Sequence, residues 1–247
     1  MREINNFKMG IRDGVPIGLG YFAVSFAFGI AATRTGLSWL EAVLISAFNL
    51  TSAGQLAALP IIAAGGGFLE LGLTQLVINL RYSLMSVSLS QRLSDSVRLP
   101  DRFLIAFGNT DEIFAVSHSK ELPIGKRYFF ALMLTPFLGW TLGTLAGALI
   151  GSVLPVIVNS ALGIAIYAML VAVFVPASRR DVRVLLCVIA SALISSAFYF
   201  VPILKGVSSG FAIIITAVAV SLFFALVCPV PDEDSEEKTV GEVDKNA

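Results

Sequence analysis

The chain has 247 residues, of which 56% are hydrophobic and only 14% are charged. Soluble globular domains carry about 25% charged residues, so this composition excludes an ordinary soluble domain and indicates a polytopic membrane protein. The apolar runs are near 20 residues long, as expected for helices and not for the ~10-residue strands of a membrane barrel. The formal net charge is zero, so no nucleic-acid partner is indicated.

We expect an all-α integral membrane protein with about six to eight transmembrane segments. Residues 1–14 would form a cytoplasmic N-terminal segment, residues 15–228 a single transmembrane transporter domain, and residues 229–247 a disordered acidic cytoplasmic tail. Lipid would surround the transmembrane domain in a cell (inner or plasma) membrane. The predicted segments are 15–33, 39–64, 68–91, 103–118, 128–151, 158–177, 182–201 and 203–228.

Two of these segments are abnormal. Segment 39–64 is interrupted by residues 49–55 (NLTSAGQ), and segment 103–118 is short and contains residues 108–112 (GNTDE). Interrupted helices at membrane depth occur only where they face protein or a cavity, and they are the best sequence indication of a transporter site.

The distribution of basic residues bears on how these two segments are arranged. If all eight segments cross and the N-terminus is cytoplasmic, five Lys and Arg residues lie outside and eleven inside. If the two abnormal segments enter and return on one side, only Arg34 and Lys205 remain outside and fourteen lie inside. The positive-inside rule favours this second arrangement, with six crossings and two re-entrant hairpins. Eight or seven crossings remain alternatives, and both counted arrangements place both termini in the cytoplasm.

Segment 68–91 carries Arg81 near its middle, where an arginine costs roughly 2.5–3.5 kcal/mol on insertion scales. Two sets of polar residues, at helical spacing, lie on two faces of this segment. They are Gln75, Asn79, Ser83, Ser86 and Ser90 on one face, and Thr74, Arg81 and Ser88 on the other. We therefore expect protein or a wet cavity around this helix, and we place the substrate site there.

Several side chains near Arg81 are candidates for that site. Arg81 can bind a carboxylate through two parallel hydrogen bonds; the alternative is an internal ion pair with Asp111 or Glu112. Asp111 and Glu112 are candidates for proton coupling, because burial raises a carboxyl pKa and a nearby arginine lowers it. The alternative for both is a wet interface.

The first interruption offers polar groups and free backbone amides. A half-helix that starts near Ser52 would direct its N-terminal amides at an anion, while Asn49 and Gln55 could hydrogen bond to an ammonium or a carboxylate. Gly54 belongs to the same candidate set, and Tyr21 could shape an apolar pocket. The alternatives are a glycine-permitted kink and simple packing.

Four glycines, at strict four-residue spacing, form a stripe on segment 128–151. Small residues on one stripe let a second helix approach closely. The stripe is either packed inside this chain or a docking face for another subunit, and it consists of Gly139, Gly143, Gly147 and Gly151.

No catalytic motif is visible. The sequence has no HExxH, no Gly-x-Ser-x-Gly and no Walker A pattern, and Cys187 and Cys228 have no metal-binding spacing. We therefore expect no enzyme activity, no metal and no cofactor.

Four ordered motifs resemble the AzlC family, the large subunits of bacterial and archaeal branched-chain amino acid exporters. The motifs are residues 14–29 (GVPIGLGYFAVSFAFG), 52–58 (SAGQLAA), 76–89 (LVINLRYSLMSVSL) and 110–115 (TDEIFA). Leu56 stands where phenylalanine is usual in that family.

The resemblance implies export of valine and related hydrophobic L-amino acids, together with a small AzlD-like membrane subunit of about four helices as partner. By position it implies functional roles for Gln55, Asn79, Arg81, Asp111 and Glu112. Our interpretation is a proton-coupled secondary exporter with substrate at Arg81 and the first interruption. The alternatives are an uncoupled channel or facilitator and a non-transporting membrane scaffold or receptor.

Overall fold

The computed structural model describes residues 3–151, parts of 153–179, and residues 181–228. The predicted acidic tail and most of the segment predicted at 158–177 lie outside the described residues. Contacts divide the chain into two compact units, one made of residues 1–173 and 208–211 and the other of residues 174–207 and 212–247. Each unit is treated by itself below.

The described part of the first unit consists of seven α-helices, and two β-bridges join Ile124 to Ile4 and to Leu93. The helices are α1 (Phe7–Arg34), α2 (Trp39–Phe48), α3 (Ser52–Ala63), α4 (Phe68–Ser90), α5 (Leu99–Phe107), α6 (Asp111–His118) and α7 (Lys126–Ile150). Both abnormal segments are helix–break–helix units, so the predicted interruptions are confirmed.

Three predicted starts are wrong. The segment predicted from residue 203 begins as a helix at Ser209, after a 3₁₀ turn at Pro202–Leu204. The first helix begins at Phe7, eight residues before the expected start, because the Asn6 side chain caps it by accepting a hydrogen bond from the backbone N–H of Met9. The second abnormal segment also begins earlier, at Leu99, with Pro100 in its first turn, where a proline removes no helical hydrogen bond.

Helices α2 and α3 form a hairpin, which we call the first hairpin. Near its tip, Gln55 Nε2 donates to Ser46 Oγ over 2.9 Å, and near its base Ala42 and Leu59 share one apolar cluster. These two pairs can both be close only if α2 and α3 run antiparallel, so the chain enters and returns.

Helices α5 and α6 form the second hairpin. Helix α6 runs antiparallel to α1, because Tyr21 contacts Glu112 while Asp13 contacts Lys120. Helix α5 runs parallel to α7, as the ion pair of Asp101 with Lys126 and the packing of Gly108 against Met133 show.

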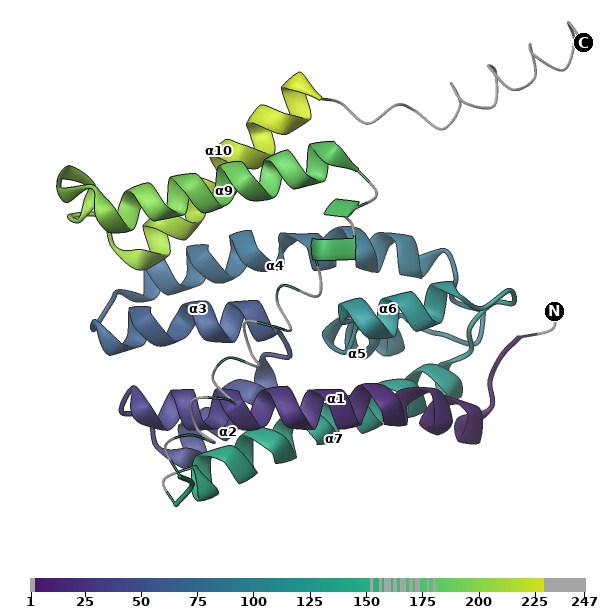
Figure 1. The fold of residues 1–247 in the computed structure, drawn as a ribbon. Coiled ribbons are helices and arrows are strands. Elements are labelled where there is room, and N and C mark those ends of the chain that lie inside the picture. Colours follow the sequence, from purple (N-terminus) through teal and green to yellow (C-terminus); the bar gives the residue numbers. More distant parts are fainter. Residues whose placement is uncertain are drawn as a thin grey trace, which may run out of the picture. The chain divides into compact units, whose positions relative to one another are not determined.

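The two hairpins enter from opposite ends of α1 (Figure 1). The base of the first hairpin packs against the C-terminal end of α1, where Ala32 joins the cluster of Ala42 and Leu59. The base of the second lies beside Asp13 in the N-terminal half of α1. This arrangement supports the re-entrant alternative.

The helix boundaries repeat along the chain. Phe48 and Phe107 end α2 and α5, and Ser52 and Asp111 begin α3 and α6, each pair being 59 residues apart. Helices α1 and α4 precede the hairpins at a similar offset. Since the hairpins enter from opposite ends, the unit α1–α3 and the unit α4–α6 have the arrangement of an inverted repeat.

Three loops come together at the N-terminal end of α1. The backbone N–H of Ile4 donates to the Pro123 carbonyl, and that of Ile124 donates to the Arg92 carbonyl. The arginine-bearing loop after α4 therefore lies on the same side as the N-terminus. This is the charge distribution expected for a re-entrant α5–α6.

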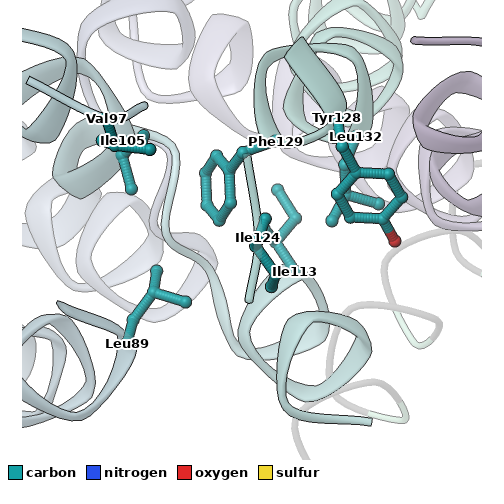
Figure 2. Packing of buried hydrophobic residues seen from close by; sticks show 8 residues of the cluster. All are labelled: Leu89, Val97, Ile105, Ile113, Ile124, Tyr128, Phe129 and Leu132. Carbon is teal, nitrogen blue, oxygen red and sulfur yellow. The ribbon is translucent and has the colours of Figure 1, made fainter. Parts of the chain in front are cut away.

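The apolar core of the first unit lies between α7 and the second hairpin. Figure 2 shows eight buried side chains of this core, contributed by α4 to α7 and the connecting loops. They are Leu89, Val97, Ile105, Ile113, Ile124, Tyr128, Phe129 and Leu132. This packing holds the base of the second hairpin in place.

The glycine stripe of α7 lies directly against α1. A Cβ atom at Gly139 would meet the backbone of Gly18, one at Gly147 would meet the carbonyl of Phe26, and Gly143 and Gly151 face α1 in the same way. The face is thus covered by this chain's own helix. Of the two alternatives for these four glycines, we therefore keep packing inside this chain and drop docking of another subunit.

The second unit contains α9 (Val182–Phe200), the 3₁₀ turn η1 (Pro202–Leu204) and α10 (Ser209–Val227), whose first three residues belong to the first unit. In the described part of the chain, α1, α7, α9 and α10 are long and apolar enough to cross a membrane. Helix α4 has 23 residues but is more polar than these four. The protein is therefore an all-α integral membrane protein, as predicted.

The close approach of α1 and α7 makes a stability prediction. Gly147→Ala should lower the melting temperature in detergent, because its methyl group overlaps the Phe26 carbonyl and overpacking costs about 1–3 kcal/mol. Gly20→Ala is the matched control, since open space surrounds Gly20 on α1. Equal melting temperatures for the two variants, measured by thermal unfolding, would contradict the packing.

Candidate functional site

The polar side chains of α4 contact the breaks of both hairpins. Towards its N-terminal half, Gln75 contacts Asn49 and Gly54 at the first break, and Asn79 donates to Gln75. Towards its C-terminal half, Arg81 and Ser86 contact Asp111 and Asn109 at the break of the second hairpin. The two polar faces predicted from the sequence are therefore covered by protein in part, while Arg81 and Ser83 are exposed.

A cluster of amide side chains binds the first break to α4. Gln75 Nε2 donates to the Gly54 carbonyl over 2.8 Å, and Gln75 Oε1 accepts hydrogen bonds from Asn49 Nδ2 and Asn79 Nδ2, both over 3.3 Å. Thr51 caps α3 by accepting from the backbone N–H of Gly54. The start of a helix leaves backbone N–H groups without helical partners, and Thr51 satisfies that of Gly54.

Gln55 lies in a separate, fully buried chain of hydrogen bonds. Its Oε1 accepts from Trp140 Nε1 over 2.8 Å, its Nε2 donates to Ser46 Oγ over 2.9 Å, and Ser46 Oγ lies 2.7 Å from Thr144 Oγ1. All four residues are at most 2% exposed. Gln55 thus fastens the first hairpin to α7, and in this structure its amide is already engaged on both sides.

Arg81 joins α4 to the second break. Its Nη1 lies 2.6 Å from Asp111 Oδ2, its Nη2 donates to the Tyr82 hydroxyl over 3.2 Å, and the guanidinium also stacks on the Tyr82 ring. The side chains of Arg81 and Asp111 are partly exposed, at 41% and 31%. The structure therefore contains the internal ion pair that was one of the two sequence-based alternatives.

Glu112 has a different kind of partner. Its carboxylate accepts a hydrogen bond from the Tyr21 hydroxyl, and the Tyr21 ring packs edge-on against Trp140 with 5.2 Å between centroids. The two adjacent carboxylates thus have different partners, because Asp111 pairs with a cation and Glu112 with a neutral phenol.

A pocket of about 170 Å³ lies where the two breaks meet. The first break, the second break and α4 all contribute to its wall. The lining residues are Phe48, Asn49, Leu50, Thr51, Asn79, Tyr82, Ala106, Phe107, Asn109 and Thr110. Typical drug-sized sites enclose about 300–1,000 Å³, so this pocket suits a much smaller molecule.

Only part of the predicted substrate set lines this pocket. Asn49 and Asn79 do, and Ser52 and Gly54 follow directly in the first turn of α3. Arg81 lies beside the lining residue Tyr82, while Gln55 and Tyr21 are held in the contacts described above. Sequence reasoning did not single out Thr51, Tyr82 and Asn109 as lining residues, although Thr51 and Asn109 belong to the two interruptions and Tyr82 adjoins Arg81.

Among the residues that the structure describes, no group of three or more His, Cys, Asp and Glu side chains could hold a metal ion. The polar atoms at the pocket are amide, hydroxyl and backbone groups. Such groups can bind and orient a small polar molecule.

The chain matches the family profile described as AzlC protein over residues 16–154, more than half of its length. It is 32% identical over 217 residues to the inner membrane protein YgaZ of Escherichia coli K12, a match covering 83% of this chain and 87% of that protein. An uncharacterized membrane protein of Archaeoglobus fulgidus is 34% identical over 181 residues, covering 72% and 78% of the two chains.

A third relative is an uncharacterized membrane protein of Helicobacter pylori 26695. It is 28% identical over 150 residues, with 59% of this chain and 64% of that protein covered. No solved structure matches significantly.

The buried hydrogen bonds of Gln55 allow a prediction about the energetic coupling of Gln55 and Trp140. Gln55→Leu should destabilise the protein by about 1–3 kcal/mol, because the Trp140 N–H loses its acceptor in a dry site. Trp140→Phe removes that donor, so the double variant should be less destabilised than the sum of the single variants. Thermal unfolding of all four proteins measures the coupling, and strict additivity would contradict the hydrogen bond.

Proposed function

Because the chain belongs to the AzlC family, we propose that it is the large permease subunit of a secondary exporter for hydrophobic L-amino acids, with valine among them. One observation carries this proposal: two interrupted helices that enter from opposite ends meet at a pocket. Discontinuous helices at the interface of an inverted repeat are the usual setting of a transporter substrate site. Family membership supports transport over catalysis.

The pocket has the chemistry expected for a small amphipathic molecule. Phe48, Leu50 and Phe107 supply apolar surface, while Asn79 and Asn109 supply amide groups. Its volume of about 170 Å³ accommodates a single amino acid better than a peptide. These features support a branched-chain amino acid as the substrate.

Proton coupling is assigned to Glu112 in this proposal. Protonation of Glu112 leaves only a neutral pair with Tyr21, whereas protonation of Asp111 would leave the Arg81 charge uncompensated. Proton entry would then drive export by favouring the access state that binds the protonated form. Asp111 acts as the structural partner of Arg81, which holds the second hairpin on α4.

A small AzlD-like membrane subunit is proposed as the partner of this chain in a two-component exporter, in the cell membrane. Support comes from the family resemblance alone. Because α1 covers the glycine stripe of α7, the partner is expected to bind another surface. Both termini are proposed to be cytoplasmic, as the basic residues predict.

Valine efflux tests the function. Cells that express the chain together with its partner should release preloaded radiolabelled valine faster than cells that express the partner alone. Arg81→Lys should reduce this flux by about tenfold or more, since lysine cannot contact Asp111 and Tyr82 together in the same fork geometry.

The matched control for Arg81→Lys is Arg102→Lys, the same change at an exposed residue of α5. Arg102→Lys should leave the flux unchanged. Equal efflux with and without the chain would refute the function, and wild-type flux in Arg81→Lys would refute the role of the guanidinium.

The pH dependence of transport distinguishes the two carboxylates. Glu112→Gln fixes the neutral form, so valine flux in proteoliposomes should lose its response to an imposed pH gradient. Asp111→Asn should keep the response but lower the rate, because Arg81 loses its counter-ion. An unchanged pH response in Glu112→Gln would contradict proton coupling at this residue.

A further inference from the structure

Two amide oxygens of the pocket lining have no hydrogen-bond partner. They are Asn79 Oδ1 and Asn109 Oδ1, both buried from solvent, and Asn109 is only 3% exposed as a residue. A buried polar atom without a partner costs free energy. Because both residues line the pocket, a ligand that donates hydrogen bonds there would remove this cost.

The hydrogen-bond network fixes which Asn79 atom has no partner. The Gly54 carbonyl can only accept, so Gln75 must present Nε2 to it and Oε1 to its other neighbours. Asn79 must then donate to Gln75 from Nδ2, which leaves Oδ1 as the free atom. The unsatisfied group is thus an acceptor, and it calls for a donor such as an ammonium group.

The two helices that begin at the pocket differ in charge. Helix α3 has no acidic residue in its first turn, whereas α6 carries Asp111 and Glu112 in its first turn. Helix N-termini attract anions through free amides and the helix dipole. The carboxylates of α6 oppose that attraction, so only the α3 terminus at Thr51 and Ser52 is left to attract an anion.

We propose that the pocket binds an α-amino acid in one orientation, with its carboxylate at the first turn of α3 and its ammonium group at Asn79 Oδ1 and Asn109 Oδ1. This inference rests on the proposed function and deepens it. The apolar side chain lies against Phe107 and Ala106. The carboxylate thus contacts the first hairpin, and the ammonium group contacts α4 and the break of the second hairpin.

Three probes test this orientation on the full-length protein in detergent, with calorimetry as the measurement. L-Valine carries both charged groups, 3-methylbutanoate lacks the ammonium group, and 2-methylpropylamine lacks the carboxylate. Ser52→Asp adds a carboxylate to the first turn of α3, where a like charge costs several kcal/mol.

Ser52→Asp should weaken the binding of valine and 3-methylbutanoate at least about tenfold. The binding of 2-methylpropylamine should be unchanged or stronger. Ser119→Asp, the same change at the exposed C-cap residue of α6 and outside the pocket lining, is the matched control, and it should bind all three probes as the wild type does.

Asn109→Leu should give the opposite pattern, with weaker valine and 2-methylpropylamine and unchanged 3-methylbutanoate. Asn109→Asp keeps the size of the side chain and should strengthen the binding of 2-methylpropylamine. This second variant therefore separates loss of the acceptor from loss of folding. If valine binds and the two patterns are exchanged or absent, the orientation is wrong while the function stands. If valine does not bind the wild type and is not exported, the function fails, and the orientation with it.

Discussion

Every interrupted helix at membrane depth leaves backbone N–H and C=O groups that lipid cannot satisfy. Thr51 meets this constraint at the first break, where it accepts from the Gly54 N–H, and α4 adds side-chain contacts to both breaks. Its polar side chains bind both breaks, through Gln75 at the Gly54 carbonyl and through Arg81 and Ser86 at Asp111 and Asn109. A helix of this polarity facing lipid would be costly, and the two hairpins remove that cost by covering it.

The hairpins are held by different kinds of interaction. The first is fixed to α7 by the neutral, fully buried chain through Gln55 and Trp140, and α7 is in turn locked to α1 by the glycine stripe. The break of the second hairpin is held by the Arg81–Asp111 ion pair and the Tyr21–Glu112 hydrogen bond. Under the proposed proton coupling at Glu112, protonation would act on the second set of contacts and not on the first.

Sequence reasoning identified the interruptions, the polar faces of α4 and the charged residues at its centre, because each is a local departure from an apolar helical pattern. The bounds of α4 were predicted within one residue. Sequence reasoning could not show that the Gln55 amide is already hydrogen bonded on both sides. Trp140 and Thr144 lie some 90 residues away, and only folding brings them close. It also could not show that α1 covers the glycine stripe, because a stripe of small residues looks the same whichever helix packs on it.

The inverted repeat explains why one pocket can have two chemically distinct ends. The same unit is used twice, with a threonine at the N-cap position of each half-helix, Thr51 and Thr110. After the cap the sequences diverge, to Ser52 in one copy and to Asp111 and Glu112 in the other. The backbone therefore brings two equivalent helix termini together, and the side chains make one terminus attractive to an anion and the other not. A symmetric pocket would favour neither orientation of a zwitterion, whereas this asymmetry selects one.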